Sequence, residues 1–119
     1  MSPYGIGRAL GERVAGAVRT DDASLEKAAR DAGIFRVRPL AVVEPRDEED
    51  VRAVLELAAA ERIPVTPRGG GTNTGGAAVG EGIVLELRPS SPLGRVVGLS
   101  AVDGMPVVRA QAGASGSWV

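Results

Sequence analysis

Apolar residues in the middle of the chain are spaced in a way that predicts a strand, a helix and a second strand. A short apolar run at residues 40–43 stops just before Pro45, which is typical of a buried strand. The next segment places apolar side chains at i, i+3, i+4 and i+7, and we predict that Pro64 ends this helix. These helical positions are Val51, Val54, Leu55 and Ala58. Together with the extended segment 63–66, residues 40–66 predict a βαβ-like unit with a right-handed connection.

Acidic residues gather where this helix is predicted to begin. Asp47 can cap the helix, and Asp50 stands three residues later, in the capping-box position. Glu48 and Glu49 suit the positive end of the helix dipole. Consecutive carboxylates also raise the alternatives of a metal site or an acid–base pair. Capping and solubility explain such a run at a helix start far more often, so we assign no metal ligand here.

The N-terminal third predicts two helices. Apolar residues recur every fourth position, which favours a peripheral helix over residues 4–18, although several glycines weaken that prediction. These residues are Ile6, Leu10, Val14 and Val18. A second short helix is predicted to begin near residues 20–24 and to run to Ala32, with Gly33 as its stop.

The C-terminal third predicts strands and turns. Residues 83–87 are typical of a strand, and a turn follows at residues 90–94. Two further apolar segments, 95–99 and 105–110, flank the dipeptide Asp103-Gly104, which is a strong hairpin signal. Within the second of these segments, Pro106 favours an edge strand. Residues 111–113 predict another turn, and Trp118 has no assignable role beyond the core or the terminus.

A glycine-rich stretch between two apolar segments carries the candidate chemistry. Glycine allows the backbone to adopt positive φ or to approach a ligand closely, and successive N–H groups in such a loop can form an anion-binding nest. Arg68 adds a positive charge at the carboxyl end of a predicted strand, where open α/β sheets place ligands. We therefore predict a cradle for a phosphate or diphosphate. The predicted binding residues are Pro67, Arg68, Gly69, Gly70, Gly71, Thr72, Asn73, Thr74, Gly75 and Gly76.

Two well-known phosphate loops do not fit this stretch. The interval from Gly71 to Gly76 has the glycine spacing of a Walker loop, but Ala77 stands where that motif needs lysine. The dinucleotide fingerprint, if it began at Gly69, would need a glycine in place of Thr74 and a helix directly afterwards. A flexible linker remains the alternative. The position of the stretch between two strand-like segments favours the cradle.

Composition narrows the possible functions. The chain has 119 residues, 44% of them hydrophobic and 24% charged, which is typical of one globular domain at most. The 14 basic and 15 acidic residues nearly cancel, so we expect neither nucleic-acid nor membrane-surface binding. The sequence contains no Cys and no His, which excludes disulfides and the commonest metal ligands. We expect a cytoplasmic protein without a signal peptide or a membrane span.

Three stretches resemble one family of flavoproteins. Residues 64–79 resemble the diphosphate loop of the FAD-binding domain shared by vanillyl-alcohol oxidase and p-cresol methylhydroxylase (PCMH), and residues 34–37 and 39–51 match the family as well. The similarity is closest to the FAD-linked oxidases of the glycolate oxidase and D-lactate dehydrogenase type. It implies an α+β fold: the N-terminal, βαβ-containing subdomain of a PCMH-type FAD-binding fold, truncated. Residues 1–38 would be a helical lead-in, and residues 39–119 a partial FAD-binding domain with the first subdomain and the start of the second.

The resemblance also implies a cofactor and an activity. We expect FAD, held non-covalently because the chain lacks the His and Cys to which flavins are attached. The complete protein would be an FAD-dependent oxidoreductase acting on a small 2-hydroxy acid, with a downstream cap or iron–sulfur domain. We expect this chain to be a gene fragment, a truncated product or a piece of a split enzyme, inactive alone and without catalytic residues. The alternative is a non-catalytic fragment or binding module that needs a partner piece to fold or to bind flavin.

Overall fold

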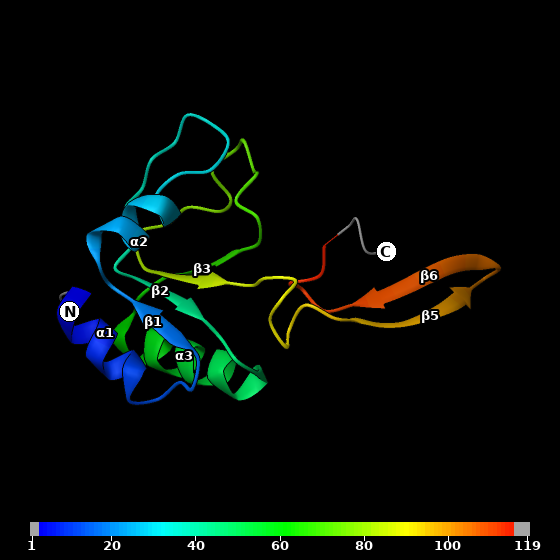
Figure 1. The fold of residues 1–119 in the computed structure, drawn as a ribbon, viewed down its shortest axis with the longest axis horizontal. Coiled ribbons are helices and arrows are strands. Elements are labelled where there is room, and N and C mark those ends of the chain that lie inside the picture. Colours follow the sequence, from blue (N-terminus) through cyan, green and yellow to red (C-terminus); the bar gives the residue numbers. More distant parts are fainter. Residues whose placement is uncertain (1–2, 116–119) are drawn as a thin grey trace.

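The computed structural model describes residues 3–115 of the chain, so Trp118 lies outside the described residues (Figure 1). Helices and strands alternate in the first part, and a long hairpin forms the second. The elements in chain order are α1 Pro3–Gly11, β1 Ala17–Arg19, α2 Asp22–Ala28, β2 Ala41–Glu44, α3 Glu48–Glu61, β3 Val65–Arg68, β4 Ile83–Glu86, β5 Val96–Val102 and β6 Met105–Ala110. The predicted α+β class is confirmed.

The first part is built on a four-stranded sheet with the order β1-β2-β4-β3. Strands β2, β4 and β3 are parallel, and β1 pairs antiparallel with β2 at one edge. The predicted strand–helix–strand unit is present as β2, α3 and β3, but β4 lies between its two strands. The carboxyl ends of β3 and β4 lie side by side, with Arg68 opposite Glu86.

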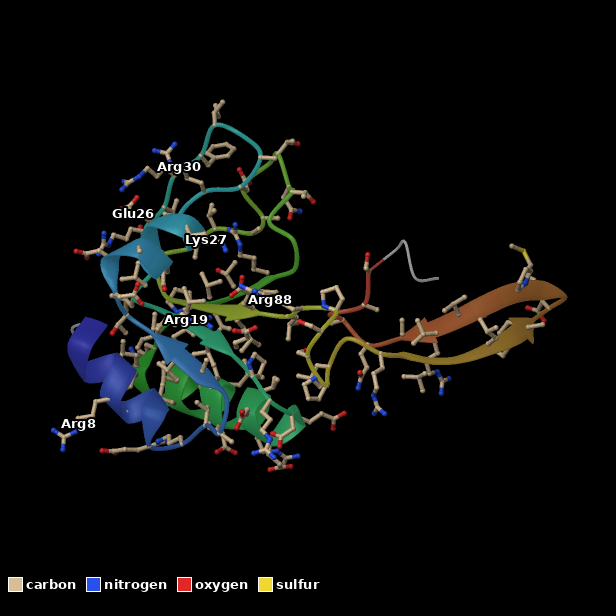
Figure 2. The ribbon with its side chains drawn as sticks, in the orientation of Figure 1. Arg8, Arg19, Glu26, Lys27, Arg30 and Arg88 are labelled. Carbon is tan, nitrogen blue, oxygen red and sulfur yellow. The ribbon has the colours of Figure 1, made fainter. Side chains whose placement is uncertain are left out.

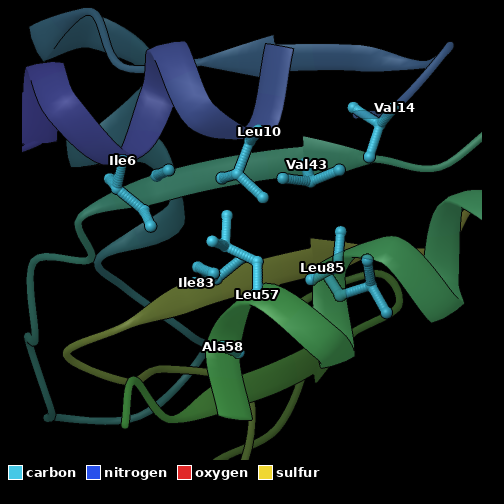
Figure 3. Packing of buried hydrophobic residues seen from close by; sticks show 10 residues of the cluster. Ile6, Leu10, Val14, Val43, Leu57, Ala58, Ile83 and Leu85 are labelled. Carbon is cyan, nitrogen blue, oxygen red and sulfur yellow. The ribbon is translucent and has the colours of Figure 1, made fainter. Parts of the chain in front are cut away.

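The two faces of the sheet are covered by different helices. Successive residues of a strand point to opposite faces, so Val43 belongs to one core cluster and Val42 to another. Helices α1 and α3 pack on the first face, where Ile6 and Leu57 meet around the strands (Figure 3). Helix α2 packs on the second face, where Leu25 joins Val42. The second face is also the one that borders the candidate site.

Helix α3 begins as predicted and ends earlier than predicted. The Asp47 side chain accepts a hydrogen bond from the backbone N–H of Asp50 at 2.9 Å, which confirms the cap. The helix ends at Glu61, because Arg62 takes the left-handed conformation with a φ of 55°. Pro64 therefore follows the helix end rather than causing it.

The N-terminal segment corrects the prediction of one helix over residues 4–18. Helix α1 ends at Gly11, and Val18 lies in strand β1. Val14 is buried in the same core as α1 although it lies outside the helix. The chain turns into the sheet at Gly16, where a Cβ atom would lie 2.1 Å from the backbone oxygen of Glu44. Only glycine permits that approach, and the four-residue repeat could not reveal it.

Helix α2 is also shorter than predicted. Asp21 caps it by accepting a hydrogen bond from the N–H of Ser24 at 3.0 Å. The helix ends at Ala28, well before the predicted stop at Gly33. After it, the backbone N–H of Val37 donates to the carbonyl of Ala29 at 2.8 Å, which folds the following segment back toward the helix end.

The hairpin of β5 and β6 is confirmed and projects away from the sheet (Figure 1). Its turn residues Asp103 and Gly104 have φ values of 50° and 78°, as a two-residue hairpin turn requires. Pro106 lies in β6, opposite Ala101, in a ribbon of two strands. Several large apolar side chains on this hairpin are exposed: Val96, Val97, Leu99, Val102, Met105 and Val108.

Candidate functional site

The glycine-rich stretch lies where the sequence predicted, at the carboxyl edge of the sheet. Its first two residues, Pro67 and Arg68, belong to strand β3 itself. The remainder connects β3 to β4, which begins at Ile83. The carbonyl of Arg68 still accepts a hydrogen bond from the N–H of Leu87 at 2.8 Å, so sheet pairing continues up to the point where the loop departs.

The loop holds a run of backbone donors that no protein group uses. Within residues 3–115, no N–H from Gly69 through Gly75 donates to a protein acceptor. The N–H of Gly76 differs, because it donates to Asp31 Oδ2 at 2.9 Å. Unpaired backbone donors need water or a ligand, so the run between these two ends is available to an anion.

Two glycines of the loop require the left-handed backbone. Gly71 has a φ of 70° and Gly76 a φ of 85°. A Cβ atom on Gly71 would lie 2.3 Å from Arg68 Nη2, so the loop passes directly over the guanidinium group. A side chain at Gly71 would both strain the backbone and displace Arg68.

Arg68 holds the loop against its neighbours. Its Nη1 donates to the carbonyl of Ala28, at the end of α2, at 3.2 Å and to the carbonyl of Ala78 at 3.3 Å. The side chain thus links helix α2 with the far end of the loop. Both acceptors are neutral, so the guanidinium keeps its positive charge available to a nearby anion.

A cleft of about 520 Å³ lies between α2 and the carboxyl ends of β3 and β4. Of the predicted residues, Arg68, Gly69 and Gly70 line it, whereas Pro67 and the residues from Gly71 onward do not. The other lining residues are Arg19, Ser24, Lys27, Ala28, Val42, Glu86, Leu87, Arg88 and Pro89. Figure 2 shows Arg19 of β1, Lys27 of α2 and Arg88, which follows β4, gathered around this region.

The cations of the cleft differ in how they are paired. Arg19 forms an ion pair with Glu44 at 2.9 Å. Arg88 pairs with Glu86 at 3.0 Å and with Glu44 at 3.3 Å, and the hydrogen bond that Arg88 donates to Glu86 raises the pKa of Arg88 above its ordinary value. Lys27 forms no ion pair with any residue in the described part of the chain. Lys27 and Arg68 are therefore the cleft cations whose charge no carboxylate offsets.

Sequence reasoning missed the cations outside the glycine loop. Arg19 and Lys27 belong to the segment 1–38, which the resemblance describes as a helical lead-in. Arg88 follows the end of β4, and the parallel pairing of β3 with β4 brings it to the same edge as the loop. The position of Arg88 just after a predicted strand could have indicated that Arg88 lies at the same sheet edge as the loop. No pattern in the sequence indicates that α2 packs onto the sheet beside that edge.

Two other kinds of site are not found among residues 3–115. No cluster of three or more His, Cys, Asp or Glu side chains is placed to hold a metal ion in this part of the chain. No helix within the same residues has the length and apolar character to cross a membrane.

Two solved structures share this fold with the chain. The xylooligosaccharide oxidase from Myceliophthora thermophila C1, solved with xylobiose, superposes with a TM-score of 0.60 at 20% identity, over 92% of this chain and 23% of the oxidase. The BBE-like 1 protein of Physcomitrella patens superposes with a TM-score of 0.52 at 20% identity, over 66% of this chain and 18% of that protein. The shared fold is that of the PCMH-type FAD-binding domain, as the sequence predicted.

Residues 39–118 match the FAD binding domain family, and the chain belongs to that family. The chain is also similar in sequence to two curated proteins. The D-2-hydroxyglutarate dehydrogenase of Escherichia coli K12 is 40% identical over 86 residues, which cover 70% of this chain and 8% of the dehydrogenase. The glycolate oxidase subunit GlcD of the same strain is 34% identical over 97 residues, which cover 73% of this chain and 19% of the subunit. The chain thus spans less than a fifth of either relative.

Proposed function

We propose that the glycine loop and the cleft beside it bind the diphosphate of FAD. The observation that carries this proposal is the run of unused N–H groups from Gly69 to Gly75, next to two cations that no carboxylate neutralises. Backbone N–H groups without protein acceptors favour negative charge nearby, and Arg68 and Lys27 add to the same potential. Membership of the FAD binding domain family supplies the identity of the dinucleotide.

The proposed binding residues are the ten of the glycine-rich stretch, with Lys27 added from α2. The backbone of Gly69 to Gly75 supplies donors, and the side chains of Thr72, Asn73 and Thr74 supply further short ones. Of these ten residues, only Arg68, Gly69 and Gly70 line the cleft, and Pro67 and Gly76 lie at the two ends of the stretch. We propose that the cofactor is held non-covalently, because the sequence offers neither His nor Cys for attachment.

The complete protein is proposed to oxidise a small 2-hydroxy acid, by analogy with the dehydrogenase and oxidase relatives. Flavin supplies hydride transfer when it is bound, and the residues of this chain bind and orient it. We assign no catalytic residue here. The division into a lead-in at 1–38 and a partial FAD domain at 39–119 is part of the same proposal, as are the downstream cap or iron–sulfur domain and the cytoplasmic location.

Ligand competition tests the proposed mode of binding. Purified chain is titrated with FAD, ADP and riboflavin, and each Kd is measured by calorimetry or flavin fluorescence. Binding through the diphosphate predicts that ADP competes with FAD and that riboflavin, which has no phosphate, binds far more weakly. It also predicts that affinity falls as salt is raised, because charges carry the interaction. Equal binding of riboflavin and FAD would show that the diphosphate is not the anchor.

A further inference from the structure

The Asp31 carboxylate joins the segment after α2 to the end of the glycine loop. Its Oδ1 accepts a hydrogen bond from the N–H of Gly33 at 2.7 Å, and its Oδ2 accepts one from the N–H of Gly76 at 2.9 Å. The two partners lie far apart in the sequence, so this single side chain fixes one segment against the other. Asp31 does not line the cleft, and no role was predicted for it from the sequence.

Further contacts link the same two segments. The N–H of Ala32 donates to the carbonyl of Asn73 at 2.8 Å. A Cβ atom on Gly33 would lie 2.3 Å from the carbonyl oxygen of Thr74, so the backbones touch there. Figure 1 shows the two loops side by side above α2. The segment 29–37 thus forms a brace along residues 73–76.

The hydrogen bond between Gly76 and Asp31 marks one end of the run of free N–H groups in the loop. Gly76 is the residue at which the loop takes a φ of 85°, and its N–H is the one that Asp31 occupies. The preceding N–H groups, from Gly69 to Gly75, stay without a protein acceptor among the described residues. A fixed point at Gly76 and another at Arg68 hold the ends of this run, so the run keeps its shape before a ligand arrives.

The charge of Asp31 points to the same role. A carboxylate beside a loop that binds an anion weakens that binding by Coulomb repulsion. Both oxygens of Asp31 accept backbone N–H bonds, so the side chain acts through geometry and not through attraction to a ligand.

We infer that Asp31 is a positioning residue, which holds the glycine loop in its anion-binding conformation. The inference rests on the proposed function for its consequence, the binding of a diphosphate. Its structural part, the fixed conformation of residues 73–76, can be tested without any ligand.

The first experiment measures amide hydrogen exchange by NMR in the ligand-free chain. Asp31→Ala removes both acceptors, and Asp31→Asn keeps the shape and one acceptor oxygen while losing the charge. Asp22→Asn is the control, because Asp22 is an exposed acid of α2 that pairs with Arg38 and not with the loop. We expect exchange at Gly76 and Ala32 to speed up at least about tenfold in Asp31→Ala, less in Asp31→Asn, and not in the control. Unchanged exchange at Gly76 in Asp31→Ala would overturn the inference.

The second experiment measures the Kd for ADP and FAD with the same variants, after thermal unfolding has shown that each is folded. A positioning role predicts about tenfold weaker binding for Asp31→Ala and an intermediate loss for Asp31→Asn. Tighter binding by both variants would show that the charge dominates, and it would overturn the inference. Failure of the wild-type chain to bind ADP or FAD would count against the proposed function, and the exchange experiment would still decide the role of Asp31.

Discussion

Asp50 Oδ2 accepts a hydrogen bond from the backbone N–H of Gly16 at 2.8 Å. The same carboxylate accepts from Ala15 at 2.8 Å and from Arg46 at 2.8 Å, and its side chain is buried, with 4% of the residue exposed. One acid in the first turn of α3 therefore holds the turn that leads into β1. These hydrogen bonds connect Ala15 and Gly16 to residues 39–118, the region that matches the FAD binding domain family.

We predict that Asp50→Ala lowers the free energy of unfolding by about 2–4 kcal/mol, because three backbone donors lose a charged acceptor. Urea unfolding followed by circular dichroism measures the change. Glu49→Gln is the matched control, since Glu49 is an exposed neighbour in the same helical turn. A loss of the same size in both variants would contradict the role of the Asp50 bonds.

Stability should also depend on pH through Asp50. Burial raises the pKa of this carboxyl, but the hydrogen bonds from Ala15, Arg46 and Gly16 outweigh burial and hold the pKa below its ordinary value of 3.8. A folded-state pKa below the unfolded value gives stability that is complete above pH 3.8 and is lost as the pH falls through the folded value. Unfolding midpoints should therefore drop more steeply below that pH in the wild type than in Asp50→Ala.

Gly71→Ala should weaken binding of ADP and FAD. The new Cβ would occupy the space of the Arg68 guanidinium, at a φ that costs an L-residue about 1–2 kcal/mol. If this strain opposes the binding conformation of the loop, calorimetric Kd values should rise about 5- to 30-fold. Gly11→Ala is the control, because a Cβ there meets nothing within 4 Å. Unchanged affinity in Gly71→Ala would mean that the loop is only a connector.

Lys27→Gln should lower the affinity for ADP by a few-fold and reduce its dependence on salt, since one unpaired cation is removed from the cleft. Lys27→Arg keeps the charge and should bind nearly as the wild type does. Arg8→Gln removes an equal charge from α1, on the other face of the sheet, and serves as the control. Equal losses in Lys27→Gln and Arg8→Gln would indicate a general effect of net charge.

The hairpin should contribute little to the stability of the sheet. Leu99 is 79% exposed, so Leu99→Thr should change the free energy of unfolding by less than about 0.5 kcal/mol. Leu10 is fully buried between α1 and the sheet, and Leu10→Ala should cost about 2–5 kcal/mol. Similar losses for the two variants in urea unfolding would show that the hairpin packs against something in solution.

The elements predicted best from the sequence are those fixed by local chemistry. The cap at Asp47 and the turn at Asp103-Gly104 depend on residues within a few positions of each other, and both are present. Strand β1 was missed because its three residues pair with β2, far along the chain. A four-residue repeat of apolar side chains cannot distinguish a long helix from a helix followed by a strand that packs on the same core.

The candidate site also contains a part that could be predicted from local sequence and a part that depends on contacts between distant segments. The glycine loop was predicted from its run of glycines and from its position between two strand-like segments, because glycine permits positive φ and close approach to a ligand. The contributions of Lys27 and Asp31 depend on where α2 packs, and that placement is set by burial of Leu25 against Val42 across the sheet. Contacts between distant segments leave no spacing pattern that a single sequence can show.

The strand order has a consequence for how the molecule is made. Strand β4 occupies an interior place in the sheet although it is the last of the four strands in the chain. During synthesis β2 and β3 have no shared partner until residues 83–86 have left the ribosome, and pairing between such distant segments is slow. Strand β1 can pair with β2 earlier, but β3, which leads into the glycine loop, joins the sheet only when β4 inserts between β2 and β3.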